Sequence, residues 1–381
     1  MNYILCVGVF LLVNSIFIWK YLSRTAYSPV VGILAWSLLA GAVCALAFRL
    51  FSNERRAKWA SMVLLAACFS VIASALVLID PLSVNVDRWS ALDYFIRALF
   101  DGTYPYGVET HIGNHPSPFP LWHYLHIPFY WLGDVGLALF AYLAAFVFTV
   151  RWFTRSWIPT FFSLLLLSLS PAYWWEVIVR SDGLGNAMVV FCIIMWMERR
   201  QISFCHPKQG PWVACAFICG LVAVTRLSAA LPLAIYTFKS FLFASHRRQL
   251  LSLLMIMAIV LSFFAPYIFW DTQTWIFFSV NPMMTQTQQG HPLVLLLMIG
   301  IELWLVLRYN TTFDRYVSST ACFLFVFFLT AIVNNHLISN AETPWMEDAS
   351  FDISYLTLAF PYCLFSLARR ENGQLWTSQS R

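Results

Sequence analysis

Residues 59–79 read WASMVLLAACFSVIASALVLI, a run of 21 residues without a charged side chain. A run of this length can cross the hydrocarbon core of a bilayer as a helix. Its apolar residues are continuous and do not alternate with polar ones, which favours a helix over a membrane-spanning strand. The run therefore predicts a transmembrane helix.

Similar runs continue on both sides of this one. The chain has 381 residues, of which 60% are hydrophobic and 11% are charged, and this composition excludes an ordinary soluble domain. The fold class that we expect is all-α, a polytopic membrane protein with about twelve transmembrane helices. The expected spans are 3–19, 28–48, 59–79, 135–150, 157–175, 184–198, 211–226, 228–243, 250–270, 292–308, 316–334 and 351–368.

Charge predicts the orientation of these spans. With the N-terminus in the cytoplasm, 17 of the 23 Lys and Arg residues lie in inside segments, and 13 of the 18 Asp and Glu residues lie outside. We therefore expect a multi-pass protein of the plasma (inner) membrane with both termini cytoplasmic. Residues 1–368 form one transmembrane domain, and residues 369–381 form a cytoplasmic tail. The net charge of +5 reflects this topology and does not indicate a nucleic-acid partner; the expected environment is the lipid bilayer.

The segment 80–131 interrupts the apolar pattern directly after the quoted run. It reads DPLSVNVDRWSALDYFIRALFDGTYPYGVETHIGNHPSPFPLWHYLHIPFYW and is predicted to lie on the extracytoplasmic side. Residues 87–100 suit a helix in the membrane interface, with Trp89, Leu92, Phe95 and Leu99 available to lie on lipid. An aromatic segment at 119–131 is expected to enter the interface next.

Carboxylates are the chemically notable groups of this segment. Asp87 precedes the interfacial helix, so it could be the N-cap of that helix or a general base at the lipid–water boundary. The two roles are compatible, because a capping carboxylate can still face a pocket. Asp93 and Asp101 are expected to be solvated.

Further downstream, Arg180 and Arg226 are rare cations on the side predicted to be outside. They could anchor span ends in the interface or bind a lipid phosphate through the planar guanidinium group. Glu176 lies one helical turn before Arg180 and could pair with it. Glu302 lies within a span, as a paired group or as part of a polar path.

Histidine spacing gives no support for a metal site. His115 fits a loop histidine better than a zinc ligand: no HExxH pattern is present, and the HxxxH spacing from His111 to His115 lies in a predicted loop, not on a helix. No cofactor is expected, and the sequence leaves the use of a divalent metal open.

The order of these motifs resembles the integral-membrane glycosyltransferases of the GT-C superfamily. Those enzymes place an acidic residue, an interfacial helix, a turn with Pro-Tyr and a proline-rich segment in their first extracytoplasmic loop. Two departures exist: the loop follows the third span instead of the first, and Asp87 is followed by Arg88 instead of a second acid. The second departure argues against the metal-dependent oligosaccharyltransferase type. The matching positions are Asp87-Arg88, Gly102, Tyr104-Pro105-Tyr106, His115 to Leu121, Ser170-Pro171, Arg180-Ser181-Asp182, Thr225-Arg226 and Asp352 to Pro361.

The resemblance implies a metal-independent hexosyl- or pentosyltransferase that acts on the outer face of the membrane. Its donor would be a polyprenyl-phosphate-linked sugar, and its acceptor a glycan, a lipid or a protein. Asp87 would be the catalytic base, with Arg180 and Arg226 as phosphate ligands. Three further residues complete the expected substrate site, namely Arg88, Asp182 and His115.

Two other functions stay open at this stage. A transporter or flippase of lipid-linked glycans would fit the intramembrane Glu302 and the outward arginines, although the sequence shows no inverted repeat. An O-antigen-type polymerase or ligase also acts outside on lipid-linked glycans, but such proteins rely on a large late loop, whereas the large loop here comes early.

Overall fold

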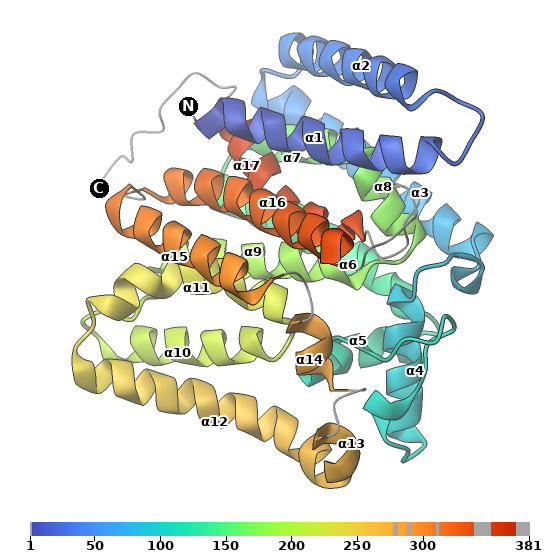
Figure 1. Ribbon diagram of the computed structural model, residues 1–381. Helices are drawn as coiled ribbons and strands as arrows, with labels where there is room; N and C mark the ends of the chain where they lie inside the picture. Colours follow the sequence, from blue (N-terminus) through green and yellow to red (C-terminus); the bar gives the residue numbers. More distant parts are fainter. Residues whose placement is uncertain (1, 277–280, 288–290, 310–311, 339–351, 371–381) are drawn as a thin grey trace.

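The computed structural model describes residues 2–276, 281–287, 291–309, 312–338 and 352–370. Over these residues the chain is helical and contains no β-strand. Figure 1 shows the long helices packed side by side as a bundle. The α-helices are α1 (Asn2–Leu22), α2 (Pro29–Leu50), α3 (Glu54–Leu78), α4 (Arg88–Phe100), α5 (Pro120–Trp131), α6 (Ala138–Thr154), α7 (Trp157–Ser168), α8 (Pro171–Ile178), α9 (Asp182–Arg200), α10 (Gln209–Ala223), α11 (Leu227–Leu242), α12 (His246–Trp270), α13 (Thr272–Ile276), α14 (Pro282–Thr287), α15 (Pro292–Arg308), α16 (Phe313–Ile338) and α17 (Phe360–Arg370).

Four short 3-10 helices join these elements. They are η1 (Pro81–Ser83), η2 (Pro105–Gly107), η3 (Val135–Leu137) and η4 (Ile353–Ala359). Within the bundle, α6 packs on α9, α3 on α7, α10 on α12, and α17 on α1, α7 and α16.

The first eleven predicted spans fall on helices, and the last one, 351–368, begins outside the described residues and continues as η4 and α17; these helices differ in length and character. Among the described residues, six are long and apolar enough to cross a membrane: Tyr3–Leu22, Pro29–Leu50, Glu54–Leu78, Val135–Thr154, His246–Trp270 and Phe313–Leu337. Such helices place the protein in a lipid bilayer. The number of twelve spans stays a prediction.

A sharp bend divides the predicted span 157–175. Helices α7 and α8 meet at an angle of 70° and together are long and apolar enough for one further span. The bend follows from local sequence: Pro171 starts α8, where a missing N–H costs nothing, and the Ser170 hydroxyl accepts from the backbone N–H of Tyr173 at 3.1 Å. The bend places the end of α8 beside the start of α9, where the cavity described below lies.

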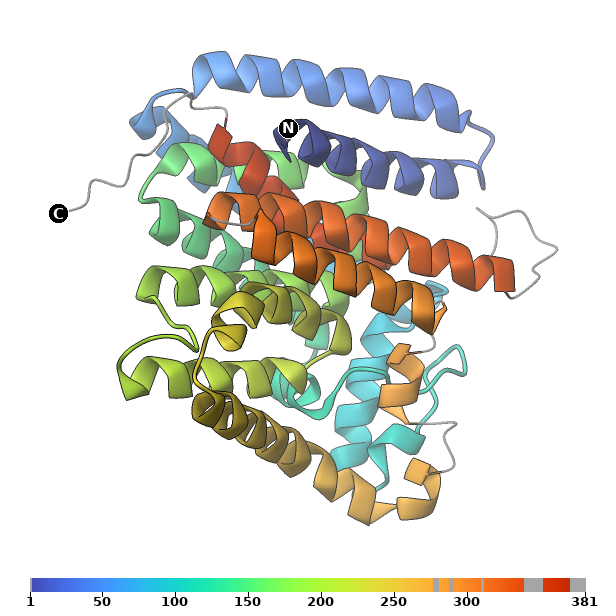
Figure 2. The same ribbon diagram turned by 60° about the vertical axis from the view of Figure 1, so that its left-hand side comes forward.

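The loop region 80–131 folds into α4 and α5, which pack against each other. Figures 1 and 2 place both helices with α13 and α14 at one end of the bundle. The start of α1 lies at the opposite end in Figure 1. Segments that are far apart in the sequence therefore gather around one end of an apolar bundle, and the membrane side that this end faces stays a prediction.

The helix predicted at 87–100 is present as α4, but much of its apolar face is covered by protein, and its place in the membrane interface stays a prediction. Leu92 and Phe95 of α4 are buried, and the Phe95 ring stacks on His123 of α5 with the ring centroids 3.6 Å apart. Asp93 is also buried and pairs with Arg97 at 2.8 Å, so the expectation of a solvated Asp93 was wrong, whereas Asp101 is exposed. The apolar face of α4 packs on α5, so protein side chains make the apolar contact that lipid was expected to make.

Candidate functional site

A small cavity lies where α8 and η4 meet the first residues of α4, α9 and α11. Its volume is about 10 Å³, close to what one water molecule needs. Two arginines, one acid and three hydroxyl-bearing serines contribute to its wall, so the cavity is polar although it lies in an apolar bundle. The lining residues are Arg88, Glu176, Ser181, Gly183, Arg226, Ser228, Ser354, Tyr355 and Leu358.

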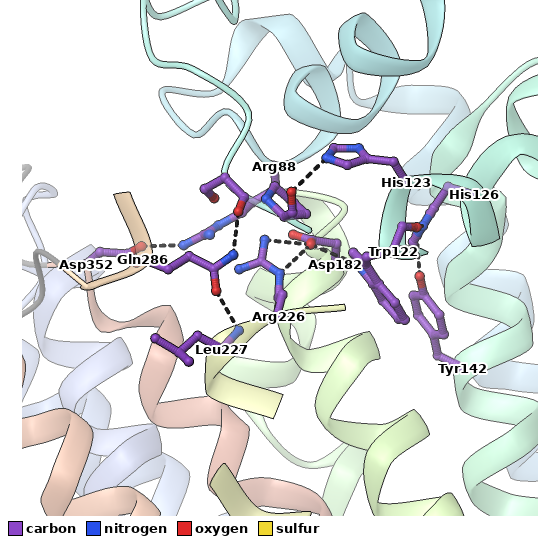
Figure 3. A network of polar contacts seen from close by, with 12 residues as sticks. Arg88, Trp122, His123, His126, Tyr142, Asp182, Arg226, Leu227, Gln286 and Asp352 are labelled. Carbon is purple, nitrogen blue, oxygen red and sulfur yellow. Dashed lines mark hydrogen bonds and ion pairs between the residues drawn. The ribbon is translucent and has the colours of Figure 1, made fainter. Parts of the chain in front are cut away.

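A buried ion pair supports one side of the cavity. Arg226 at the start of α11 contacts Asp182 at the start of α9, with Nε at 2.8 Å and Nη2 at 2.6 Å from Oδ2. The indole N–H of Trp122 in α5 donates to the same oxygen at 3.0 Å (Figure 3). Both charged side chains are at most 3% exposed. A charge at this depth needs a partner, and the pair supplies it.

Electrostatics keep Asp182 ionised. Burial by itself would raise the pKa of this carboxyl, but the positive charges of Arg226 and Arg88 and the hydrogen bond from Arg226 outweigh burial and hold the pKa below its ordinary value. The start of α9 also favours an anion, because helix N-termini carry partial positive charge. One of the two oxygens, Oδ1, is buried without a hydrogen-bond partner in the described structure.

Arg88 supports the opposite side of the cavity. It begins α4 and forms an ion pair with Asp352, which is the N-cap of η4. Its guanidinium lies over the ring of Tyr355, 5.4 Å from the centroid. Arg88 Nε is buried and has no partner among the described residues. One donor of this arginine is therefore available to a ligand in the cavity.

Backbone hydrogen bonds fix the first loop to the break between α10 and α11. Phe119 N donates to Thr225 O at 2.9 Å, and Leu121 N donates to Val224 O at 3.1 Å. In α14, the Gln286 amide bridges the two segments: Nε2 donates to the Ser117 carbonyl, and Oε1 accepts from Leu227 N at 2.7 Å (Figure 3). Residues a hundred positions apart in sequence thus form one site.

Two buried histidines pack behind the ion pair. His126 Nδ1 donates to the Trp122 carbonyl at 2.7 Å, and its Nε2 shares a hydrogen bond with the Tyr142 hydroxyl; burial favours the neutral ring, in which Nε2 is the acceptor. Burial lowers the pKa of His126, and burial with the nearby His126 lowers the pKa of His123 well below its ordinary value. His123 Nε2 donates to the Pro118 carbonyl at 3.1 Å.

The base candidate, Asp87, lies next to the cavity in sequence but does not line it. It occupies the N-cap position of α4, yet its side chain makes no capping hydrogen bond, so that part of the expectation was wrong. Instead, the carboxylate accepts from Asn114 Nδ2 at 2.8 Å and is partly exposed. An aspartate that does not cap its helix keeps its carboxylate available for chemistry.

Arg180 and His115 have other partners. Arg180 Nη1 contacts Asp134 at 2.7 Å, and Nη2 donates to the carbonyls of Leu76 and Ile79. The expected pairing of Arg180 with Glu176 is absent from the described structure, because Arg180 has a positive φ of 50° and the chain turns between the two helices. His115 Nδ1 contacts the Val108 carbonyl at 3.0 Å within its own loop.

The structure therefore brings three of the expected site residues together, namely Arg88, Asp182 and Arg226. The sequence did not predict the contacts of Trp122 with Asp182 and of Asp352 with Arg88, because these partners are distant in sequence. Glu176 was noticed, but for the wrong partner. Among the described residues, no group of three or more His, Cys, Asp or Glu is placed to hold a metal ion.

Comparisons of this chain with protein-family models, with curated proteins and with solved structures found no match. The resemblance to GT-C glycosyltransferases therefore depends on the sequence motifs alone.

Proposed function

We propose that this protein transfers a sugar from a polyprenyl-phosphate-linked donor to an acceptor on the extracytoplasmic face of the membrane. One observation carries the proposal: Arg88 and Arg226 come from distant segments and line the same buried cavity at the loop-bearing end of an apolar bundle. Guanidinium groups bind phosphate through several charge-assisted hydrogen bonds. The bundle supplies the lipid-facing surface that a polyprenyl chain requires.

The chemistry of this reaction matches the residues available. The donor's phosphate leaves as an anion, so arginines beside it stabilise the charge that develops on the departing group. The acceptor hydroxyl must lose a proton, and a nearby carboxylate can accept that proton. Asp87 is the neighbour of Arg88, and its carboxylate is partly exposed, so we assign it the role of base.

In its present form the cavity is too small for a sugar. The ion pairs of Arg88 with Asp352 and of Arg226 with Asp182 close it to about the volume of one water molecule. A donor therefore has to displace part of the wall. The Arg88–Asp352 pair is the side that opens at lower cost, because Asp352 is 40% exposed and water can solvate it after separation.

The test is an assay of the purified protein with a panel of polyprenyl-phosphate sugars, scored by release of polyprenyl phosphate. Wild type should release it with at least one donor, and Asp87→Asn should abolish release while expression and folding stay intact. Glu109→Gln, at an exposed position of the same loop, is the matched control and should keep wild-type turnover. Normal turnover by Asp87→Asn would remove the base assignment. No release with any donor would favour transport of a lipid-linked glycan.

A further inference from the structure

Glu176 is a buried acid whose environment is unusual. It lies in α8 and is 1% exposed, and neither carboxylate oxygen makes a hydrogen bond of full geometry in the described part of the chain, although the hydroxyls of Ser181 and Ser354 and the charge of Arg88 lie close enough to act on it. A buried polar group without a partner costs free energy, and a charged one costs more.

The position of Glu176 connects it to the cavity. Glu176 lines the cavity together with Arg88 and Arg226, and the hydroxyls of Ser181 and Ser354 share the same wall. The cavity thus holds unused acceptors on Glu176 and an unused donor, Nε of Arg88. A ligand that satisfies both must carry an acceptor group, which the charges of the two arginines favour as an anion, and, beside it, a hydrogen-bond donor.

We propose that Glu176 binds a sugar hydroxyl of the donor while the arginines hold the adjacent phosphate. This inference rests on the proposed function and names the part of the substrate that each wall recognises. A phosphate alone satisfies the arginines and leaves Glu176 unpartnered, whereas a sugar phosphate satisfies both. Glu176 is then a specificity residue that distinguishes the sugar-bearing donor from the product, polyprenyl phosphate without a sugar.

Replacement of Glu176 by an apolar residue should raise the stability of the protein and lower its affinity for the donor. Glu176→Leu replaces an unpartnered acid with an apolar side chain of similar size, so the free protein should become more stable. The same change should remove the preference for sugar-bearing lipid. A structural role for Glu176 would give the reverse result for stability.

The experiment measures binding of two probes by the full-length protein in detergent. The probes are polyprenyl monophosphate and polyprenyl-phosphate mannose, glucose or arabinose, whichever binds wild type most tightly. Wild type should bind the sugar-bearing lipid more tightly than the bare phosphate. Glu176→Leu should weaken the affinity for the sugar-bearing lipid by about 10- to 100-fold, the range for a hydrogen bond to a charged group. The affinity for polyprenyl monophosphate should not change.

Glu302→Leu is the matched control. Glu302 is also a buried acid in an apolar helix, 3% exposed and with Oε1 unpartnered among the described residues, but it does not line this cavity. Its replacement should keep both affinities. Glu176→Gln, which retains one acceptor oxygen, should weaken the sugar-bearing lipid less than Glu176→Leu does.

The outcomes separate this inference from the proposed function. If wild type releases polyprenyl phosphate but Glu176→Leu keeps the full affinity for the sugar-bearing lipid, the inference is overturned and the transferase stands. If wild type does not prefer the sugar-bearing lipid, the inference is also overturned. If wild type binds neither lipid and releases nothing, both proposals fail together.

Discussion

Among the aspartate–arginine pairs at the loop-bearing end of the molecule, Asp134–Arg180 and Asp182–Arg226 use their atoms differently. In the pair Asp134–Arg180, Oδ1 of the aspartate accepts from Trp89 and from the Gly136 backbone, and Oδ2 accepts from the arginine. Arg180 also donates to two carbonyls of the α3 terminus. Every charged group in this junction is satisfied by the protein.

The second pair, Asp182–Arg226, is less completely satisfied although it is more deeply buried. Oδ2 of Asp182 receives all three donors, and Oδ1 receives none in the described structure. The adjoining cavity adds the unpartnered Nε of Arg88 and the unpartnered carboxylate of Glu176. A structure that satisfies one ion pair fully and leaves polar atoms unused around another marks the second as the place for a ligand.

The largest effect that tests this comparison concerns stability. Asp182→Ala leaves Arg226 as an unpaired cation that is 3% exposed, and should lower the free energy of unfolding by roughly 3–5 kcal/mol. Asp134→Ala is the matched variant and should cost roughly 1–3 kcal/mol, because Arg180 keeps its two carbonyl partners and water reaches the site. Denaturant titration in detergent micelles measures both; an equal or larger loss for Asp134→Ala would contradict the ranking.

The next effect concerns ligand binding. Arg88→Gln should weaken the affinity for polyprenyl monophosphate by about 10- to 100-fold, because it removes charge-assisted hydrogen bonds from the cavity wall. Arg180→Gln is the control at the satisfied junction and should keep an affinity close to wild type. Equilibrium binding of labelled polyprenyl phosphate measures both variants. A loss of affinity in Arg180→Gln at unchanged stability would restore Arg180 to the phosphate site, as the sequence predicted.

The contrast between the two pairs also shows how far the sequence alone can lead. Hydrophobic run length predicted helices at the positions of the twelve spans, and an amphipathic pattern predicted a helix at 87–100, since these features depend on neighbours in the chain. Arg88, Asp182 and Arg226 stood out as polar residues beside apolar runs. Their convergence was not predictable from spacing, because it depends on the backbone bonds that join Phe119 to Thr225.

Arg180 and Glu176 show why the other contacts of the site could not be predicted from the sequence. A spacing of four residues suggests pairing on one continuous helix. The helix ends at Ile178, however, and the positive φ of Arg180 directs the chain into α9. Because the helix breaks here, Arg180 and Glu176 do not pair with each other. No periodic pattern in the sequence predicts this break.

The smallest effect is a pH dependence that arises behind the Asp182–Arg226 pair. The pKa values of buried His123 and His126 lie below the ordinary value, chiefly because of burial; the positive charge of Arg226 acts in the same direction, and Asp182 opposes it. The folded protein therefore keeps both rings neutral as pH falls, whereas the unfolded chain binds protons near pH 6.5. Because the unfolded state binds more protons, stability falls as pH is lowered from 7.5 to 5.5, by at most about 1.4 kcal/mol for each histidine.

His123→Phe isolates this contribution from the rest of the protein. A phenylalanine keeps an aromatic ring against Phe95 and removes the group that titrates. Asp182 stays ionised in both states between pH 5.5 and 7.5, since its pKa in the folded protein is below an ordinary value near 4. The variant should therefore lose less stability than wild type over this range, in denaturant titrations at the two pH values. An unchanged pH dependence would mean that His123 is protonated equally in the folded and unfolded states, and that water reaches the region behind the ion pair.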